Sequence, residues 1–373
     1  MEYDEKGKSI IIDNGTGYIK AAISGEEDSK IIIPNCIGKP KSSGSSYKEK
    51  NDYVFGNEIE PIKKDLIIKY PINRGIVQDW DLMEKIWGHI LYQFHSAPEE
   101  CNVMLTQPIT NPKDQAEKMI QIMFETFDVQ GFYITNPPFL SFYSIGKLTG
   151  LAVDSGASLT QYLAMLEGYL LPGGRDLIEF GGKDLTEYLV RLLNEIKYIP
   201  IDKEKDIAEL AKVKACYVAL DYQSELKYVE PFEYTLPDVN HIFIRDQRIR
   251  CCEALFNPSL AGMDYDENIA EYCNKCIKSC DDDQRNDLYS NIILFGGNTM
   301  FKGFSERFAE EIKKLAGYKY EEVVNVTAPY EKNLAALKGG CVLSSLSEFE
   351  NQWITKNEYE EWGPYIVHSK IKI

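Results

Sequence analysis

The chain has 373 residues, enough for two domains with separate cores, and 44% of them are hydrophobic, as in ordinary soluble globular proteins. A formal net charge of −17 argues against direct nucleic-acid binding and suits basic protein surfaces as partners. The polar first nine residues, and the lack of any apolar run of about 20 residues, predict neither a signal peptide nor membrane insertion.

The first predicted element is an isoleucine-rich strand that ends at Asp13 and leads through a tight turn into a second strand carrying Lys20. Asn14-Gly15 is a hairpin signal, because Asn and Gly tolerate a positive φ. A turn of small residues exposes backbone N–H groups that can bind phosphate oxygens. Thr16 adds a hydroxyl, Lys20 a cation, and Asp13 a carboxylate that can hold the waters of a magnesium ion. Alone, this motif is explained equally well as an ordinary hairpin.

Residues 41–51 contain almost no apolar side chains and are predicted to form a mobile loop. A helix is expected directly after Asp79, its N-cap. The apolar face of this helix is expected to consist of Leu82, Met83, Ile86, Trp87 and Ile90. A further helix is predicted to begin with Asn111 as N-cap and Pro112 at the first helical position. Its core face would be Met119, Ile120, Met123, Phe124 and Phe127.

The pattern of the first hairpin recurs in residues 151–160, where an apolar strand is followed by Asp154, small residues around Gly156 and another strand. Residues 291–300 are predicted to be a strand that ends in Gly296-Gly297 before a helix. Two hairpin phosphate loops with a strand–Gly-Gly–helix element resemble the superfamily that contains actin, the 70-kDa heat-shock chaperones and the sugar kinases. In that superfamily two similar halves clamp ATP in the cleft between them.

Cys273, Cys276 and Cys280 lie at positions i, i+3 and i+7 and leave two interpretations open. A Cys-x-x-Cys pair is compatible with zinc, but residues 269–280 are helical by period and no histidine lies nearby in the sequence. We therefore favour thiols packed on a buried helix face. The odd total of nine cysteines indicates reduced thiols, and hence a cytoplasmic or nuclear location.

Longer segments narrow the resemblance to one family. The chain resembles actin over almost its whole length, most clearly in residues 70–75, 81–87, 97–100, 121–127, 167–169, 182–188, 216–221, 353–359 and 363–368. The protein is therefore identified as a member of the actin family, either a divergent actin or an actin-related or actin-like protein.

The resemblance implies an α/β fold with two lobes, the ATPase fold of actin, heat-shock chaperones and sugar kinases (ribonuclease H-like), with a nucleotide cleft between the lobes. The small lobe would comprise residues 1–144 and 335–373, with a subdomain inserted at 35–70. The large lobe would comprise residues 145–334, with a subdomain inserted at 181–263.

The resemblance also implies a site for ATP or ADP with Mg²⁺, or Ca²⁺ in vitro. Asp13 and Asp154 would face the metal through water, and Asp154 and Gln161 are the candidate catalytic residues. One phosphate loop would consist of Asp13, Asn14, Gly15, Thr16, Gly17, Tyr18 and Lys20. The other would consist of Asp154, Gly156, Ala157, Ser158 and Leu159. The adenosine pocket would be lined by Gly182, Lys212, Gly296, Gly297, Asn298, Met300 and Phe301.

Several positions depart from the actin pattern. Pro137 stands where actin has the glutamine that helps to place the attacking water, and Gln161 stands where actin has a histidine. Ala157 replaces an aspartate, so one carboxylate near the metal is missing. The glutamate that grips the ribose hydroxyls corresponds to Val213, and the lysine beside the adenine corresponds to Asn333.

These features predict an actin-like adenine-nucleotide-binding protein of the cytoskeleton or of a multi-protein complex, in which the nucleotide acts as a conformational clamp. At most weak ATPase activity is expected, and weak self-polymerisation, because residues 41–51 offer little apolar surface to bury. The alternative is a filament-forming ATPase that hydrolyses ATP on assembly; a kinase or chaperone is disfavoured because added substrate domains are missing. Expected partners are actin, other actin-related proteins and actin-binding proteins.

Overall fold

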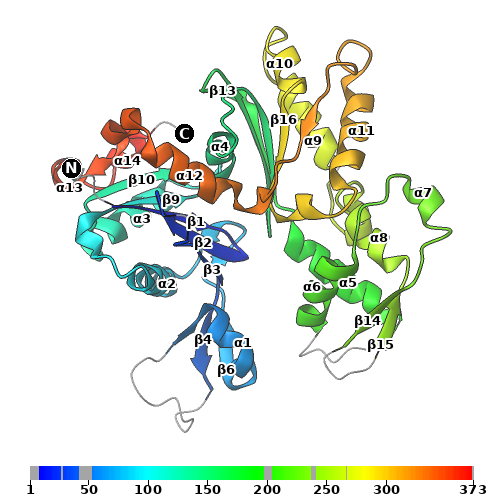
Figure 1. Ribbon diagram of the computed structural model, residues 1–373, viewed down its shortest axis with the longest axis horizontal. Coiled ribbons are helices and arrows are strands. Elements are labelled where there is room, and N and C mark those ends of the chain that lie inside the picture. Colours follow the sequence, from blue (N-terminus) through cyan, green and yellow to red (C-terminus); the bar gives the residue numbers. More distant parts are fainter. Residues whose placement is uncertain are drawn as a thin grey trace. The chain divides into compact units, whose positions relative to one another are not determined.

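The computed structural model describes residues 8–26, 28–41, 53–196, 204–236, 241–265 and 267–371. The chain divides into two compact units: unit 1 contains Met1–Lys147 and Leu334–Ile373, and unit 2 contains Leu148–Asn333 (Figure 1). From residue 42 onward, the segment predicted to be a mobile loop lies outside the described residues. Within the described ranges, no helix is both long enough and apolar enough to cross a membrane.

Unit 1 is built on a six-stranded sheet with the order β18-β10-β9-β1-β2-β3. These strands are β1 Lys8–Asn14, β2 Tyr18–Ile23, β3 Ile31–Pro34, β9 Cys101–Thr106, β10 Gly131–Thr135 and β18 Ile354–Thr355. β1, β2 and β3 are antiparallel neighbours, whereas β9 runs parallel to β1 and β10 runs parallel to β9. Ile10, Ile11 and Ile12 are fully buried, as expected for a strand that is covered on both faces.

The helices of unit 1 are α2 Trp80–Gln93, α3 Lys113–Glu125, α4 Pro137–Tyr143, α12 Ala335–Ser345, α13 Lys356–Trp362 and α14 Ile366–Lys370. α2 begins as predicted, because the Asp79 carboxylate accepts the Leu82 N–H at 3.1 Å. The predicted start of α3 was wrong by one residue. Pro112 occupies the N-cap position, and the Asn111 amide donates instead to Gln107 Oε1 at 2.7 Å.

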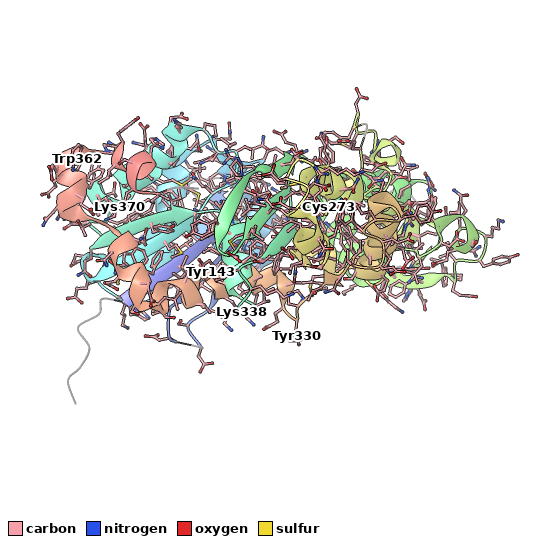
Figure 2. All side chains as sticks on the ribbon, turned by 90° about the horizontal axis from the view of Figure 1, so that it is seen from above. Tyr143, Cys273, Tyr330, Lys338, Trp362 and Lys370 are labelled. Carbon is pink, nitrogen blue, oxygen red and sulfur yellow. The ribbon has the colours of Figure 1, made fainter. Side chains whose placement is uncertain are left out.

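The apolar faces predicted for these two helices form the core of unit 1. Leu82, Met83, Ile86, Trp87 and Ile90 of α2 are buried, as are Met119, Ile120, Met123 and Phe124 of α3. Phe127 is partly buried against the same core. Figure 2 shows Trp362 and Lys370 on the C-terminal helices, where Lys370 Nζ donates to the carbonyl oxygen of Trp353 at 2.6 Å.

A small sheet with the order β5-β4-β6 lies in the chain between β3 and α2. The elements of this region are β4 Ile37–Pro40, β5 Val54–Phe55, α1 Ile59–Ile62, β6 Leu66–Lys69, β7 Ile72–Asn73 and β8 Ile76–Val77. Cys36, Ile59 and Leu66 form its own small core. The chain therefore leaves the main sheet after β3 and returns to the main core of unit 1 at the β7–β8 hairpin, where Ile72 and Val77 are buried.

Unit 2 is built on a five-stranded sheet with the order β13-β12-β11-β16-β17. These strands are β11 Gly150–Ser155, β12 Thr160–Leu166, β13 Tyr169–Ile178, β16 Ile292–Phe295 and β17 Val326–Thr327. β11, β12 and β13 are antiparallel neighbours, β16 runs parallel to β11, and β17 runs parallel to β16. The connectivity β10-β9-β1-β2-β3 of unit 1 is therefore repeated in unit 2, and the two-unit α/β organisation agrees with the predicted fold class.

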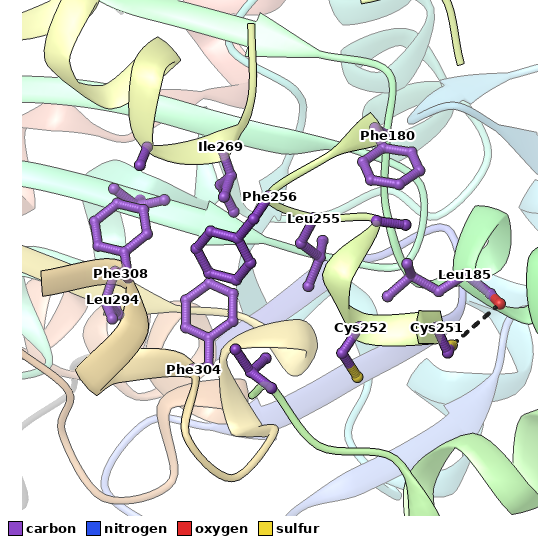
Figure 3. Close-up of a cluster of buried hydrophobic side chains, with 14 of the residues drawn as sticks. Phe180, Leu185, Cys251, Cys252, Leu255, Phe256, Ile269, Leu294, Phe304 and Phe308 are labelled. Carbon is purple, nitrogen blue, oxygen red and sulfur yellow. Dashed lines mark hydrogen bonds between the residues drawn. The ribbon is translucent and has the colours of Figure 1, made fainter. Parts of the chain in front are cut away.

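The helices of unit 2 are α5 Gly182–Asn194, α6 Glu204–Ala215, α7 Tyr222–Glu225, α8 Gln247–Glu253, α9 Ile269–Lys278, α10 Arg285–Tyr289 and α11 Phe304–Ala316, with the hairpin β14 Phe232–Thr235 and β15 His241–Ile244. Phe304 packs against Phe256 and Phe308 in the core, with ring centroids 5.8 and 5.9 Å apart (Figure 3). Cys273 and Cys276 of α9 are buried free thiols within this core. Cys280, just after α9, is buried in the same core, so the burial of all three agrees with the predicted packing of thiols.

Candidate functional site

Loop 1, residues 15–17, joins β1 to β2 at the carboxyl end of β1. Asp13 lies opposite Lys20 in this hairpin, and Asn14 opposite Ile19 forms the last pair before the loop. Neither Asn14 nor Gly15 has a positive φ, so the turn chemistry expected from the sequence is wrong. Glycine is needed for another reason, because a Cβ on Gly15 would collide with the carbonyl oxygen of Tyr18.

The two charged residues predicted for the site in unit 1, Asp13 and Lys20, lie together at the base of loop 1. Lys20 Nζ lies 3.1 Å from Asp13 Oδ2, and Thr106 Oγ1 donates to Asp13 Oδ1 at 2.9 Å. Asp13 is only 6% exposed, so its two oxygens are held in fixed directions. A hard carboxylate beside a lysine suits a hydrated divalent cation next to a phosphate. Sequence reasoning missed Thr106, because 93 positions separate it from Asp13 and only the parallel pairing of β1 with β9 brings them together.

Asn14 anchors loop 1 to the core of unit 1. Its Oδ1 accepts the Trp87 indole N–H at 3.0 Å, and its Nδ2 donates to the Thr106 carbonyl oxygen at 3.2 Å. Its backbone N–H donates to Thr106 Oγ1 at 2.8 Å. The Asn14 side chain is thus bonded at both ends inside the protein, which gives it a structural role in holding the loop.

Two segments that flank the small sheet also hold loop 1. Asn35, directly after β3, donates from its backbone N–H to the Gly17 carbonyl oxygen at 3.0 Å and from Nδ2 to the Gly15 carbonyl oxygen at 2.9 Å. Gly75, between β7 and β8, donates its N–H to Thr16 Oγ1 at 3.0 Å. Sequence reasoning did not identify Asn35, since nothing in its local context marks a contact with the loop. Beside these anchors, Tyr18 is half exposed.

Loop 2, residues 156–159, joins β11 to β12 and closes with a hydrogen bond from the Gly156 N–H to the Leu159 carbonyl oxygen at 2.8 Å. It packs on the first turn of α5, whose Gly182 N–H donates to the Gly156 carbonyl oxygen at 3.0 Å. The Lys183 N–H donates to the Ala157 carbonyl oxygen at 2.6 Å. These bonds satisfy donors that a helix start leaves without intrahelical partners. Gly181 permits the contact, because a Cβ there would lie 2.7 Å from the Ser158 nitrogen.

Asp154 and Gln161 occupy opposed positions on β11 and β12, so their side chains share one face of the sheet. Gly296 has a φ of +88°, and a Cβ on it would lie 2.5 Å from Asp154 Oδ1 and would collide with the Ser155 carbonyl oxygen. Asn298 Nδ2 donates to the Gly156 carbonyl oxygen at 2.7 Å. The Gly-Gly turn after β16 therefore lies against the end of β11 and the beginning of loop 2.

Lys212 of α6 is buried and bonds to three oxygens of unit 2. Its Nζ lies 2.7 Å from each of the Gly182 carbonyl oxygen, Thr186 Oγ1 and Glu209 Oε2. These bonds tie α6 to the first turn of α5, on which loop 2 rests. Glu209 was not among the predicted site residues, although its i, i+3 spacing from Lys212 on a helix was a usable signal.

The other residues predicted for the adenosine pocket lie around the Gly-Gly turn. Met300 is 52% exposed, Phe301 is partly buried against the core, and Gly297 has open space around its Cα. The Lys332 carbonyl oxygen accepts the Gly296 N–H at 3.1 Å. Burial lowers the pKa of the Lys332 ammonium group, an effect that the nearby Glu306 carboxylate partly offsets.

Pro137 is the first residue of α4, and Asn136 is its N-cap, accepting the Phe139 N–H at 3.0 Å. Proline suits this position, because the first helical N–H has no intrahelical partner. Asn136 Nδ2 and Thr135 Oγ1 are buried without a hydrogen-bond partner among the described residues. After β10 the chain therefore has the ring of Pro137 and the buried side-chain amide of Asn136, where the family resemblance led us to expect a glutamine side chain.

No three His, Cys, Asp or Glu side chains are grouped closely enough to hold a metal ion directly in the part of the chain that the structure describes. A family model described as Actin matches residues 4–372, nearly the whole chain.

Proposed function

Since this chain belongs to the actin family and is an actin-like nucleotide-binding protein, we propose that its ligand is ATP or ADP with Mg²⁺. Loop 1 and loop 2 would both contact the phosphates, with Asp13 and Asp154 holding the metal through water. The observation that supports this most strongly is the repetition: the same hairpin loop follows the first strand of two sheets with the same connectivity.

Each half would contribute a different chemistry. Lys20 supplies a cation for phosphate oxygens, and the loops supply backbone N–H groups. The Gly-Gly turn and the start of α5 would contact the adenosine, as the family resemblance suggests. The lost ribose and adenine contacts at Val213 and Asn333 would make affinity lower than in actin, since a missing hydrogen bond costs about 0.5–1.5 kcal/mol.

Binding of one nucleotide to both loops would act as a conformational clamp. A ligand that prefers one arrangement of two units shifts the population toward that arrangement, and this alone can change the affinity for a partner. We propose partners among actin, actin-related proteins and actin-binding proteins, in the cytoplasm and cytoskeleton. The charge of −17 favours partners with basic surfaces.

We also propose slow hydrolysis and weak self-assembly. Pro137 has neither a side-chain polar atom nor an N–H with which to hold a water molecule. Neutral Gln161 can bind water but cannot take its proton. The second candidate function, a filament-forming ATPase, is favoured only by the family itself. Pelleting of micromolar protein in magnesium and potassium salt, beside conventional actin as a positive control, separates the two: robust pelleting with phosphate release would favour the second.

The direct test is identification of the small molecule released when the purified protein is denatured, together with thermal unfolding in millimolar MgATP. We expect ATP or ADP in the supernatant and a raised melting temperature, because a ligand that binds only the folded state stabilises it by mass action. MgGTP at the same concentration is the control and should give a smaller shift. If no nucleotide is released and MgATP leaves the melting temperature unchanged, the proposal fails.

A further inference from the structure

Asn35 is a polar residue in an almost fully buried place, between β3 and β4 and against loop 1. It is 1% exposed. It forms two of the hydrogen bonds that hold the loop: its backbone N–H donates to the Gly17 carbonyl oxygen at 3.0 Å, and its Nδ2 donates to the Gly15 carbonyl oxygen at 2.9 Å. One residue therefore anchors two alternate peptide units of a three-residue loop.

The direction of these two bonds decides the direction of two N–H groups. A trans peptide is planar, and its N–H points opposite to its C=O. The Gly15 carbonyl shares its peptide unit with the Thr16 N–H, and the Gly17 carbonyl shares its unit with the Tyr18 N–H. With both carbonyls turned toward Asn35, both N–H groups point away from it. Backbone N–H groups of a turn that face the same side can form a concave anion-binding arrangement.

Asn35 is also a costly choice for a purely structural position. Its Oδ1 is buried and has no hydrogen-bond partner among the described residues. A buried acceptor left unpaired lowers stability. Space filling alone would be served better by an apolar side chain, so the amide is explained by what its Nδ2 does for the Gly15 carbonyl.

We propose that Asn35 is a positioning residue for nucleotide phosphate, which orients the peptide units of loop 1 through its amide. This rests on the proposed function, binding of an adenine nucleotide at loop 1. Asn35 acts through the loop and does not touch the ligand. Gly75 differs, because it contacts the Thr16 hydroxyl and leaves the loop carbonyls alone.

The test compares Asn35→Ala and Asn35→Asp with the parent protein by dissociation of a fluorescent ATP analogue in magnesium. Asn35→Ala removes the donor, so release should be about 3- to 10-fold faster at every pH, the fold-change that corresponds to one lost hydrogen bond. Asn35→Asp keeps the shape, but its carboxylate cannot donate and repels both the Gly15 carbonyl and phosphate. Its release at pH 8 should be faster still.

The pH dependence of the release rate distinguishes a positioning role of Asn35 from a merely structural one. The carboxyl group that Asn35→Asp introduces regains a donor once it is protonated, and burial raises the pKa of a carboxyl. As the pH falls from 8 to 5, release from Asn35→Asp should therefore slow toward the parent rate. The release rate of Asn35→Ala divided by that of the parent should stay constant over the same range. Equal release rates in the parent and both variants, or no pH dependence specific to Asn35→Asp, would overturn the inference.

Two further measurements keep the outcome clear. Melting of the nucleotide-free variants shows whether each is folded. If neither variant folds, Asn35→Ser replaces them: its shorter hydroxyl cannot reach the Gly15 carbonyl as the amide does, so release faster than in the parent supports the inference and release equal to the parent overturns it. Failure of the proposed function looks different, because then the parent itself neither binds the analogue nor is stabilised by MgATP.

Discussion

Loop 1 and loop 2 occupy the same place in two sheets of the same connectivity, but they are held in different ways. Loop 1 is held by two segments that are distant in the chain, through the side chain and backbone N–H of Asn35 and the backbone N–H of Gly75. Loop 2 rests on one helix, because its carbonyls accept N–H groups from the first turn of α5, and the Asn298 side chain adds a further donor. Loop 1 also has a lysine at its base, whereas small residues fill loop 2. The two loops thus share a topology and an aspartate on the preceding strand, but only loop 1 has a lysine beside that aspartate.

The largest expected effect is on the rate of ATP hydrolysis. Both units have positions that depart from the actin pattern there: Pro137 in unit 1, and Ala157 and Gln161 in unit 2. Pro137→Gln, Gln161→His and Ala157→Asp together should raise single-turnover phosphate release from the MgATP complex by about 10²-fold, since a positioned general base typically contributes 10²–10⁴. The matched control carries Pro137→Ala with the other two changes. Alanine restores the backbone N–H but has no side-chain amide. A parent rate equal to that of filamentous actin would contradict the premise.

The next effect tests whether loop 1 supplies the charge. Lys20→Ala should weaken MgATP binding roughly 10- to 100-fold in a titration, because it removes a charge-assisted hydrogen bond worth about 1.5–3 kcal/mol. Ser158→Ala in loop 2 should cost less than 10-fold, as expected for one neutral hydrogen bond. Lys8→Ala is the matched control, since Lys8 lies on the same sheet and pairs with Glu26 at 3.2 Å. Equal losses of MgATP affinity in Lys20→Ala and Ser158→Ala would contradict the prediction that the lysine makes loop 1 the stronger phosphate contact.

The close backbone packing in unit 2 predicts a smaller effect, on stability. Gly296→Ala should lower the free energy of unfolding by about 1–3 kcal/mol, because φ is +88° and the new Cβ meets the end of β11. Gly297→Ala, one residue further along, has no heavy atom within 4 Å of its Cβ and is the control, with an expected change below about 0.5 kcal/mol. Urea unfolding followed by circular dichroism gives both values. Similar losses would show that crowding at Gly296 is not the cause.

The smallest effect is a pH dependence confined to unit 1. His89 stacks on Phe55 with ring centroids 4.6 Å apart. Burial lowers the pKa of the His89 imidazole, and the Glu58 carboxylate partly offsets this. The folded state therefore binds the proton less readily, so the contribution of His89 is fully present above its ordinary value of 6.5 and is lost as pH falls below it. His89→Phe keeps the stack and should remove this acid-dependent part of the unfolding curve between pH 7 and pH 5.

Local signals predicted local structure well. Asp79 caps α2, and the apolar positions of α2 and α3 are buried, because helix periodicity alone fixes which side chains share a face. The repeated hairpin pattern at residues 151–160 correctly indicated two related sheets. The start of α3 was misread, because the Asn111 amide bonds to Gln107 rather than to the helix.

Long-range contacts could not be predicted in this way. Thr106 reaches Asp13 and Asn14 only once β9 lies beside β1, and Asn35 reaches loop 1 only once β3 lies beside β2. The need for glycine at position 15 comes from the approach of the Tyr18 carbonyl, which depends on the shape of the whole hairpin. Burial of Lys212 likewise depends on α6 meeting α5, two helices with no local sequence signal for their contact.

All four tryptophans of the chain, Trp80, Trp87, Trp353 and Trp362, belong to unit 1. The indole N–H of Trp87 bonds to Asn14, directly before loop 1. Tryptophan fluorescence excited at the red edge of protein absorption therefore comes from unit 1 alone, and unit 2 contributes none. The tryptophans are therefore an intrinsic probe of unit 1, with which its melting, and the nucleotide binding that we propose at loop 1, can be followed without a label. A tryptophan introduced into unit 2 would add a signal from the other unit.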